Sequence, residues 1–213
     1  MLNDLRYAVR TLRQNPGFAF TAIVSIALGI GANATIFSLA DGLVFRPLPV
    51  PKASQVVTLR SRTPTGTFGE FSYADYADFR DRIRSFDGLI AYQLAPCGFA
   101  ADSKTQPRLK YGYLVSGNFF RVLGVEPRLG RGFRIEEDRV PGEDAVVVLA
   151  HDFWKNEYSA DPGVVGRSVR LNGLDFRVIG VTPESFTGMD QLLRPAFFVP
   201  TMMGPTRQQN VLL

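Results

Sequence analysis

The sequence is poor in the residues from which most catalytic and metal sites are built. Its 213 residues include one histidine, one cysteine and one tryptophan. A single cysteine excludes an internal disulfide, and clustered His and Cys ligands for a transition metal cannot be assembled. A Ser-His-Asp site would have to use His151, the one histidine, and the sequence contains no G-x-S-x-G motif. The ATP-binding motif G-x-x-x-x-G-K-[ST] is also missing. We therefore expect no enzyme activity, no cofactor, and no catalytic or metal-ligating residue.

Charge of one sign is not concentrated anywhere in the chain. The 24 basic residues, of which four are lysines, exceed the 20 acidic residues by only four. The densest basic stretch, Arg80-Asp81-Arg82-Ile83-Arg84, has acidic residues in and around it. Nucleic-acid binding needs basic residues gathered on one face. We therefore expect no nucleic-acid partner.

One long apolar run stands out against this background. Phe18 to Ala40 are 23 consecutive positions without a charge. As a helix this run would span roughly 34 Å, enough to cross a hydrocarbon core of about 30 Å. We expect a transmembrane helix within residues 18–45. The stiff sequence Arg46-Pro47-Leu48-Pro49 then leads into a single domain at 46–213.

The first 17 residues predict a short basic amphipathic helix on the cytoplasmic side. Leu2, Leu5, Val9 and Leu12 recur at helical spacing, and three arginines share a neighbouring face. Such a helix is suited to lie on an anionic leaflet of the bilayer. The N-terminus is then cytoplasmic and the domain extracytoplasmic.

Two alternatives apply to the apolar run. Ala32-Asn33-Ala34 could be the cleavage site of a signal peptide, which would release a secreted, soluble binding or adaptor domain. Apolar character continues past that site through Ile36, Phe37 and Leu39, which favours an uncleaved helix. Gly29 to Ala34 also matches the dinucleotide motif G-x-G-x-x-A, but the acidic residue expected about 20 positions later is missing.

Small residues in the run predict contacts with another membrane helix. Ser25, Gly29 and Asn33 are spaced at i, i+4 and i+8, and Ala27, Gly31 and Thr35 follow the same spacing. Small residues at this spacing let two helices approach closely, and an Asn can hydrogen-bond across the contact. Such a contact is expected in a packed domain of several membrane helices. The alternative is that small residues are simply common in membrane helices.

The remainder predicts an α+β domain of short elements without regular β-α-β alternation. Helices are expected after the N-cap Ser72, through about Arg84, and at 117–123 and 152–158, the last with His151 at its start. Asn172-Gly173 predicts a hairpin turn. Glu136-Glu137-Asp138 is interpreted as a solvated acidic loop. Strands are expected at 55–60, 89–94, 108–115, 145–150, 168–171, 176–181 and 197–199.

The order of many weak motifs resembles the start of MacB/FtsX-like permeases of ABC transporters. The matching segments are Asp4-Leu5-Arg6-Tyr7-Ala8, Asn15-Pro16-Gly17-Phe18, Leu28-Gly29-Ile30-Gly31-Ala32-Asn33, Ile36-Phe37-Ser38, Arg46-Pro47-Leu48-Pro49, Val115-Ser116-Gly117-Asn118-Phe119-Phe120, Leu123-Gly124-Val125, Gly130-Arg131, Val148-Leu149, Phe153-Trp154, Asp161-Pro162 to Val165-Gly166, Leu171-Asn172-Gly173 and Val178-Ile179-Gly180-Val181. The domain at 46–213 resembles the MacB-like periplasmic core domain.

The resemblance implies a non-ATPase permease subunit, or an N-terminal fragment of one, in the bacterial inner (plasma) membrane. In that family a cytoplasmic ABC ATPase drives an extracytoplasmic domain for export or mechanical transmission. Partners would be the lipid bilayer, further permease helices or a second permease copy, and the ATPase subunit. The family carries later membrane helices after this domain, so we expect the domain to be incomplete and the chain to be a fragment. No catalytic residue carries over.

The mass of the mature protein separates the anchor from the cleaved signal peptide. We expect the full mass of 23.6 kDa, because apolar residues continue beyond Ala34 and keep the helix in the bilayer. Intact-mass spectrometry of the membrane fraction checks this. A soluble product that begins at Thr35 would contradict the anchor.

Overall fold

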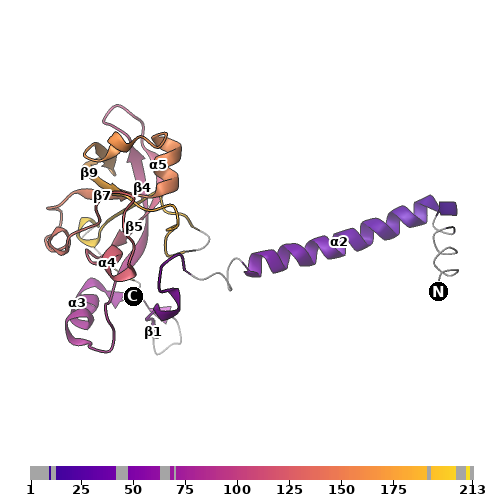
Figure 1. The fold of residues 1–213 in the computed structure, drawn as a ribbon, viewed down its shortest axis with the longest axis horizontal. Helices are drawn as coiled ribbons and strands as arrows, with labels where there is room; N and C mark the ends of the chain where they lie inside the picture. The colour runs from indigo at the N-terminus through magenta and orange to yellow at the C-terminus, as the bar shows by residue number, and fades with distance from the viewer. Residues whose placement is uncertain are drawn as a thin grey trace. The chain divides into compact units, whose positions relative to one another are not determined.

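The computed structural model describes residues 10, 13–41, 48–62, 68–69, 71–190, 193–204 and 210–211 (Figure 1). The chain divides into two compact units, residues 1–46 and 47–213. Most of the amphipathic helix expected near the N-terminus lies outside the described residues.

The first unit contains one long helix, α2 (Pro16–Ala40). Proline occupies its first turn, where the missing N–H costs nothing and the fixed φ suits a helix. The stretch Pro16–Ser38 is long and apolar enough to cross a membrane. Its large side chains pack against nothing in the described residues: Phe18 is 73% exposed and Phe37 is 77% exposed.

The second unit is built on a seven-stranded mixed sheet with the order β6-β9-β7-β10-β5-β4-β8. β8 also pairs with β9, so six strands form a closed ring and β6 pairs with β9 outside it. Ring closure removes the exposed edges that an open sheet would leave. The strands are β4 (Tyr92–Ala100), β5 (Arg108–Val115), β6 (Leu129–Gly130), β7 (Val146–Leu149), β8 (Ser168–Leu171), β9 (Leu174–Val181) and β10 (Phe197–Pro200).

The strand directions explain why β7 is apolar throughout. β7 runs parallel to β9 on one side and antiparallel to β10 on the other, and all four of its residues are buried. A strand covered on both faces reads as a continuous apolar run, here Val146-Val147-Val148-Leu149. β10 in turn runs parallel to β5, so the last strand of the ring is inserted between two earlier ones.

Short helices and minor strands complete this unit. The helices are α3 (Tyr73–Arg82), α4 (Phe119–Leu123), α5 (His151–Glu157) and the 3-10 turns η2 (Ala53–Gln55), η3 (Ile135–Asp138), η4 (Pro162–Val164) and η5 (Thr201–Met203). The two-residue strands are β1 (Ser61–Arg62), β2 (Phe68–Gly69), β3 (Phe71–Ser72) and β11 (Asn210–Val211).

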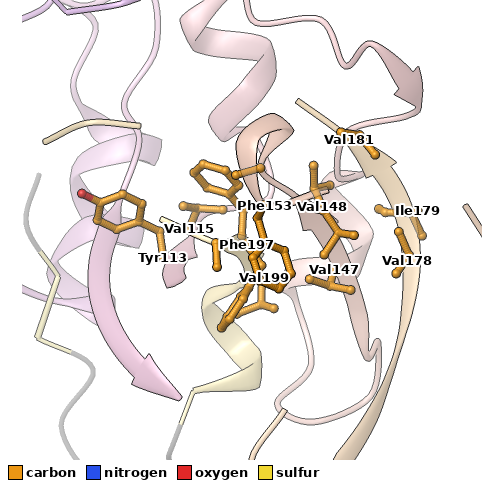
Figure 2. Packing of buried hydrophobic residues seen from close by; sticks show 14 of the residues in the cluster. Tyr113, Val115, Val147, Val148, Phe153, Val178, Ile179, Val181, Phe197 and Val199 are labelled. Carbon is orange, nitrogen blue, oxygen red and sulfur yellow. The ribbon is translucent and has the colours of Figure 1, made fainter. Parts of the chain in front are cut away.

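The main core fills the space around the ring strands. Figure 2 shows aromatic rings and valines from β5, β7, β9, β10 and α5 packed together. Phe198 is fully buried and contacts Phe119, Phe120 and Phe186 at ring-centroid distances of 5.4–6.0 Å. Burial of each such ring contributes about 2–3 kcal/mol, so this cluster dominates the stability of the unit.

A second, much smaller core lies under α3. It consists of buried Tyr76 and Ala91, with Leu59, Phe71, Tyr73, Phe79 and Leu89 packed against them. We call α3 and the chain packed on this core the α3 lobe. Ser72 caps α3 in a capping box: its hydroxyl accepts from the N–H of Asp75, and the Asp75 carboxylate accepts from the N–H of Ser72 at 2.9 Å.

The fold class and most elements agree with the sequence prediction. β5 has the predicted bounds, α3 begins at its predicted cap, and Gly124 ends α4 with a φ of +68°. Asn172 and Gly173, both at positive φ, form a two-residue hairpin turn. α5 begins at His151 as predicted.

Three predictions about local structure were wrong. Residues 56–60 form no strand, because no partner strand pairs with them in the described residues. The strand expected at 89–94 begins only at Tyr92 and continues to Ala100. Glu137 and Asp138 are buried in η3 rather than solvated, because Arg131 and backbone N–H groups pair with their carboxylates.

Gly112 in β5 is required by close packing and gives a test of the core. A Cβ placed there would lie 2.1 Å from the ring of Phe197. We expect Gly112→Ala to lower the free energy of unfolding by about 2–3 kcal/mol through overpacking. The matched control is Gly98→Ala in β4, where a Cβ meets Pro107 at an ordinary 3.4 Å. Urea unfolding of the full chain in detergent, followed by fluorescence of the buried Trp154, measures both; equal values would contradict the packing.

Candidate functional site

A hollow in the second unit lies where the α3 lobe meets the main domain. It has a volume of about 660 Å³ and is lined by α3, residues 83–89, α4 and η3. We call it the α3 cavity. A neighbouring hollow of about 570 Å³ lies between residues 50–59 and the same 85–90 and 121–124 segments. Both therefore adjoin the junction between lobe and domain.

Asp138 is the centre of this junction. Its Oδ1 accepts from the N–H of Met202 at 2.9 Å, and its Oδ2 accepts from the N–H of Gly117 at 3.0 Å. The hydroxyl of Tyr73 donates to the Asp138 carbonyl oxygen at 3.2 Å. One buried residue thus connects α3, the start of α4, η3 and η5.

The side-chain amide of Asn118 also holds α3 in place, through Tyr76. The Tyr76 hydroxyl donates to Asn118 Oδ1 at 3.1 Å, and Asn118 Nδ2 donates to the carbonyl of Leu89 at 2.9 Å. Ser116 Oγ donates to the same Asn118 oxygen and accepts from the N–H of Ala91 at 3.0 Å. Buried polar groups hold a structure in one arrangement when each has its partner.

Gly117 completes this turn because no side chain fits there. A Cβ on Gly117 would lie 2.9 Å from the carbonyl oxygen of Arg134 and 3.0 Å from Asp138 Cβ. The segment Ser116-Gly117-Asn118 therefore supplies a hydroxyl, a close backbone approach and an amide, each used in the junction.

Burial changes the acidity of the junction. Loss of hydration raises the pKa of Asp138 to about 6, against the opposing effect of the backbone N–H groups of Met202 and Gly117. Burial, followed by the nearby Asp138 carboxylate, raises the pKa of the Tyr73 phenol well above its usual range. The Tyr73 hydroxyl consequently stays protonated as a donor at every physiological pH.

The predicted helix-packing residues all lie on α2. Ser25, Ala27, Gly29, Gly31 and Asn33 are exposed, and a Cβ added at either glycine meets nothing within 4 Å. The hydroxyl of Thr35 bonds back to the carbonyl of Gly31 at 2.8 Å and stays within the helix. Their role in contacts with another helix remains a prediction.

His151 lies away from the junction, at the start of α5. It is buried against Trp154, with ring centroids 5.6 Å apart, and its Nδ1 is 3.7 Å from an oxygen of Asp152. Among the described residues, no group of three or more His, Cys, Asp or Glu side chains could hold a metal ion. The sequence search for chemistry-bearing residues therefore did not point to the junction.

Sequence reasoning missed Asp138, Asn118 and Tyr76 as partners. Their separation along the chain hides them: Tyr76 and Asn118 are 42 positions apart, and Asp138 and Met202 are 64 apart. Two local signals were available. Ser116-Gly117-Asn118 is a turn sequence that opens a helix, and Arg131 lies six positions before Glu137, with which it forms an ion pair at the surface of η3.

Comparison with solved structures defines the class of this fold. The second unit resembles the periplasmic region of MacB from Actinobacillus actinomycetemcomitans, with a TM-score of 0.54 and 14% identity over 71% of this chain and 66% of that one. It also resembles the extracellular domain of the noncanonic ABC-type transporter YknZ from Gram-positive bacteria, with a TM-score of 0.53 and 12% identity over 73% of this chain and 78% of that one. The fold is therefore that of extracytoplasmic domains of ABC-type transporters.

The family follows from the sequence match. The family model described as MacB-like periplasmic core domain matches residues 19–212, and the chain belongs to this family. Macrolide export ATP-binding/permease proteins MacB from Shigella dysenteriae and Escherichia coli are each 26% identical to it over 97% of this chain. The chain spans about a third (32%) of the length of these curated relatives. It is thus a MacB-like periplasmic domain of an ABC transporter permease, preceded by an apolar helix.

Titration of Asp138 gives a stability test with a defined sign. Its pKa is about 6 in the folded state and about 4 in the unfolded chain, so the folded state holds the proton more tightly. Stability from this group is therefore fully present below pH 4 and is lost as the pH rises to about 6, by about 3 kcal/mol. Asp138→Asn, which mimics the protonated form, should remove this decline.

Urea unfolding of the full chain in detergent at pH 4, 5, 6 and 7, followed by Trp154 fluorescence, measures the decline. Glu136→Gln is the matched control, because Glu136 is exposed on the same turn. A wild-type chain that instead gains stability between pH 4 and 6, relative to Asp138→Asn, would show that the backbone donors outweigh burial.

Proposed function

We propose that this chain forms the first membrane-spanning segment and the extracytoplasmic domain of an export permease. In this proposal α2 crosses the inner membrane with the N-terminus in the cytoplasm, and residues 46–213 lie in the periplasm. A cytoplasmic ABC ATPase supplies the energy, and the domain converts helix motion into work on a substrate or a partner protein.

The observation that carries the proposal is the exposed apolar surface of α2. Ile23, Ile26, Leu28, Ile30 and Ile36 are all 62–68% exposed, although they lie in a regular helix. Each such side chain left in water forgoes about 1.5–3 kcal/mol of burial. Lipid removes that cost, and a helix satisfies its own backbone hydrogen bonds within the bilayer.

The ATPase part of the proposal rests on the family and on the relatives' names. The matched MacB proteins are named as ATP-binding/permease proteins, and this chain carries no phosphate-binding loop. The basic segment with Arg6, Arg10 and Arg13 precedes α2, at the cytoplasmic end where contact with an ATPase is expected. The second unit has an extensive hydrophobic core among its described residues, which supports a rigid domain that could transmit force between partners.

Single-cysteine labelling in intact cells tests the arrangement. Cys97→Ala provides the background, because Cys97 is the one cysteine in the chain. In that background we expect Lys104→Cys to react with a membrane-impermeant maleimide and Gln14→Cys to react only after lysis. Both residues are exposed, and Gln14 precedes α2 in the sequence whereas Lys104 follows it. A photoactivatable maleimide on Gln14→Cys should then crosslink to a protein with an ATP-binding G-x-x-x-x-G-K-[ST] motif.

Lys104→Cys is also the control for the crosslink, because it should not capture that protein. Labelling of Gln14→Cys in intact cells would contradict the orientation. If both positions are labelled as expected but no ATPase is crosslinked, the membrane orientation is supported and the contact with an ATPase near Gln14 is contradicted.

A further inference from the structure

Three arginine side chains line the α3 cavity from three different segments. Arg84 follows α3, Arg121 lies in α4 and Arg139 directly follows η3. All three residues are exposed. Within the described part of the chain, none of the three guanidinium groups has an ion-pair or side-chain hydrogen-bond partner. Three arginines without a direct ion pair therefore line one hollow.

A fourth arginine, Arg80, is already engaged. Its guanidinium bonds to the Asp81 carboxylate at 2.8 Å and lies 5.6 Å from the ring centroid of Tyr76. Of the other two acidic lining residues, Asp138 is buried and occupied by backbone N–H groups. Asp87 is left as the one exposed carboxylate among the described lining residues without an ion pair. The cavity therefore keeps an excess of positive charge.

Exposed apolar side chains occupy the same walls. Phe86 is 39% exposed, and Val122 and Ile135 are each 37% exposed, although all three are large and hydrophobic. Arg121 and Val122 both line the cavity from α4, so this helix contributes a cationic and an apolar residue to it. A purely ionic ligand would leave this apolar surface in water, and a purely apolar ligand would leave the arginines unpaired.

We propose that the α3 cavity binds a small amphiphilic oxyanion, a phosphate or carboxylate group joined to an apolar body. Arginine presents a planar fork of donors that matches such oxyanions, which lysine does not. The volume of about 660 Å³ suits a small molecule. The oxyanion lies among Arg84, Arg121 and Arg139, and the apolar body packs on Phe86 and Val122. This site depends only on the fold of the second unit, not on the membrane topology proposed above.

Calorimetric titration of the full chain with 1-naphthyl phosphate tests the site. The protein is held in phosphatidylcholine nanodiscs, and the heat from empty nanodiscs is subtracted. We expect saturable binding with one site per chain. Arg84→Gln, Arg121→Gln and Arg139→Gln should each weaken it about tenfold, the usual effect of losing one charge-assisted hydrogen bond. Arg128→Gln, exposed and outside the cavity, should bind as the wild type does.

Further ligands separate the two halves of the proposal. Phe86→Ala should weaken 1-naphthyl phosphate but leave inorganic phosphate unchanged, and 1-naphthol should bind weakly to every variant. Phosphatidylglycerol in the nanodisc distinguishes the sources of the oxyanion. If phosphatidylglycerol weakens the binding of 1-naphthyl phosphate, and Arg121→Gln abolishes this competition, the natural ligand is a lipid headgroup. If phosphatidylglycerol does not compete, the ligand is a soluble anion.

Two results would overturn the proposal: no saturable binding to the wild type, or binding by all three arginine variants that is as tight as that of the wild type. Folding is checked by the urea midpoint of Trp154 fluorescence, which these exposed substitutions should leave at the wild-type value. A variant with a shifted midpoint is replaced by the corresponding Arg→Lys, which keeps the charge but removes the fork and should bind with intermediate strength.

Discussion

The buried carboxylate of Asp138 is the contact on which the arrangement of the domain depends. Among the described residues, the core of the α3 lobe has Tyr76 and Ala91 buried, too little apolar surface to fold independently. It is held by hydrogen bonds from Tyr73 and Tyr76 to Asp138 and Asn118, which the main domain positions. The α3 cavity exists because these few polar contacts join two bodies that do not pack fully against each other.

The junction and the main core are stabilised by different interactions. The ring of strands is closed and filled by aromatic and branched side chains, so burial of apolar surface is the main source of its stability. Asp138 sits at the boundary, where burial and two backbone donors act on the carboxylate in opposite directions. A ligand in the adjoining cavity would act on this boundary, which is less strongly held than the core.

The first unit obeys a different constraint. α2 is regular and uncharged, yet its largest side chains face outward, so its surroundings must supply the burial that the chain does not. The small residues at Ser25, Gly29 and Asn33 leave room on that surface for another helix. Family membership agrees with this division into an apolar helix and a periplasmic domain.

Elements fixed by nearby residues were predictable. The Ser72 cap and the Asn172-Gly173 turn each act within a few positions, and both were found where expected, as was the strand β5. Contacts between distant segments were not. Residues 56–60 have strand-like composition but pair with no strand among the described residues. Asp138 in the acidic run is buried because the N–H groups of Gly117 and Met202, 21 and 64 positions away, donate to its carboxylate.

The sequence by itself determined the long apolar helix, the α+β class and the family, because the length of an apolar run, the hydrophobic periodicity and the order of motifs can be read directly along the chain. Only the tertiary structure decided that β10 lies between β5 and β7 and that Arg84, Arg121 and Arg139 share one cavity. The physical reason is that strand pairing and the proximity of charges depend on which distant segments come into contact. Local propensity does not determine those contacts.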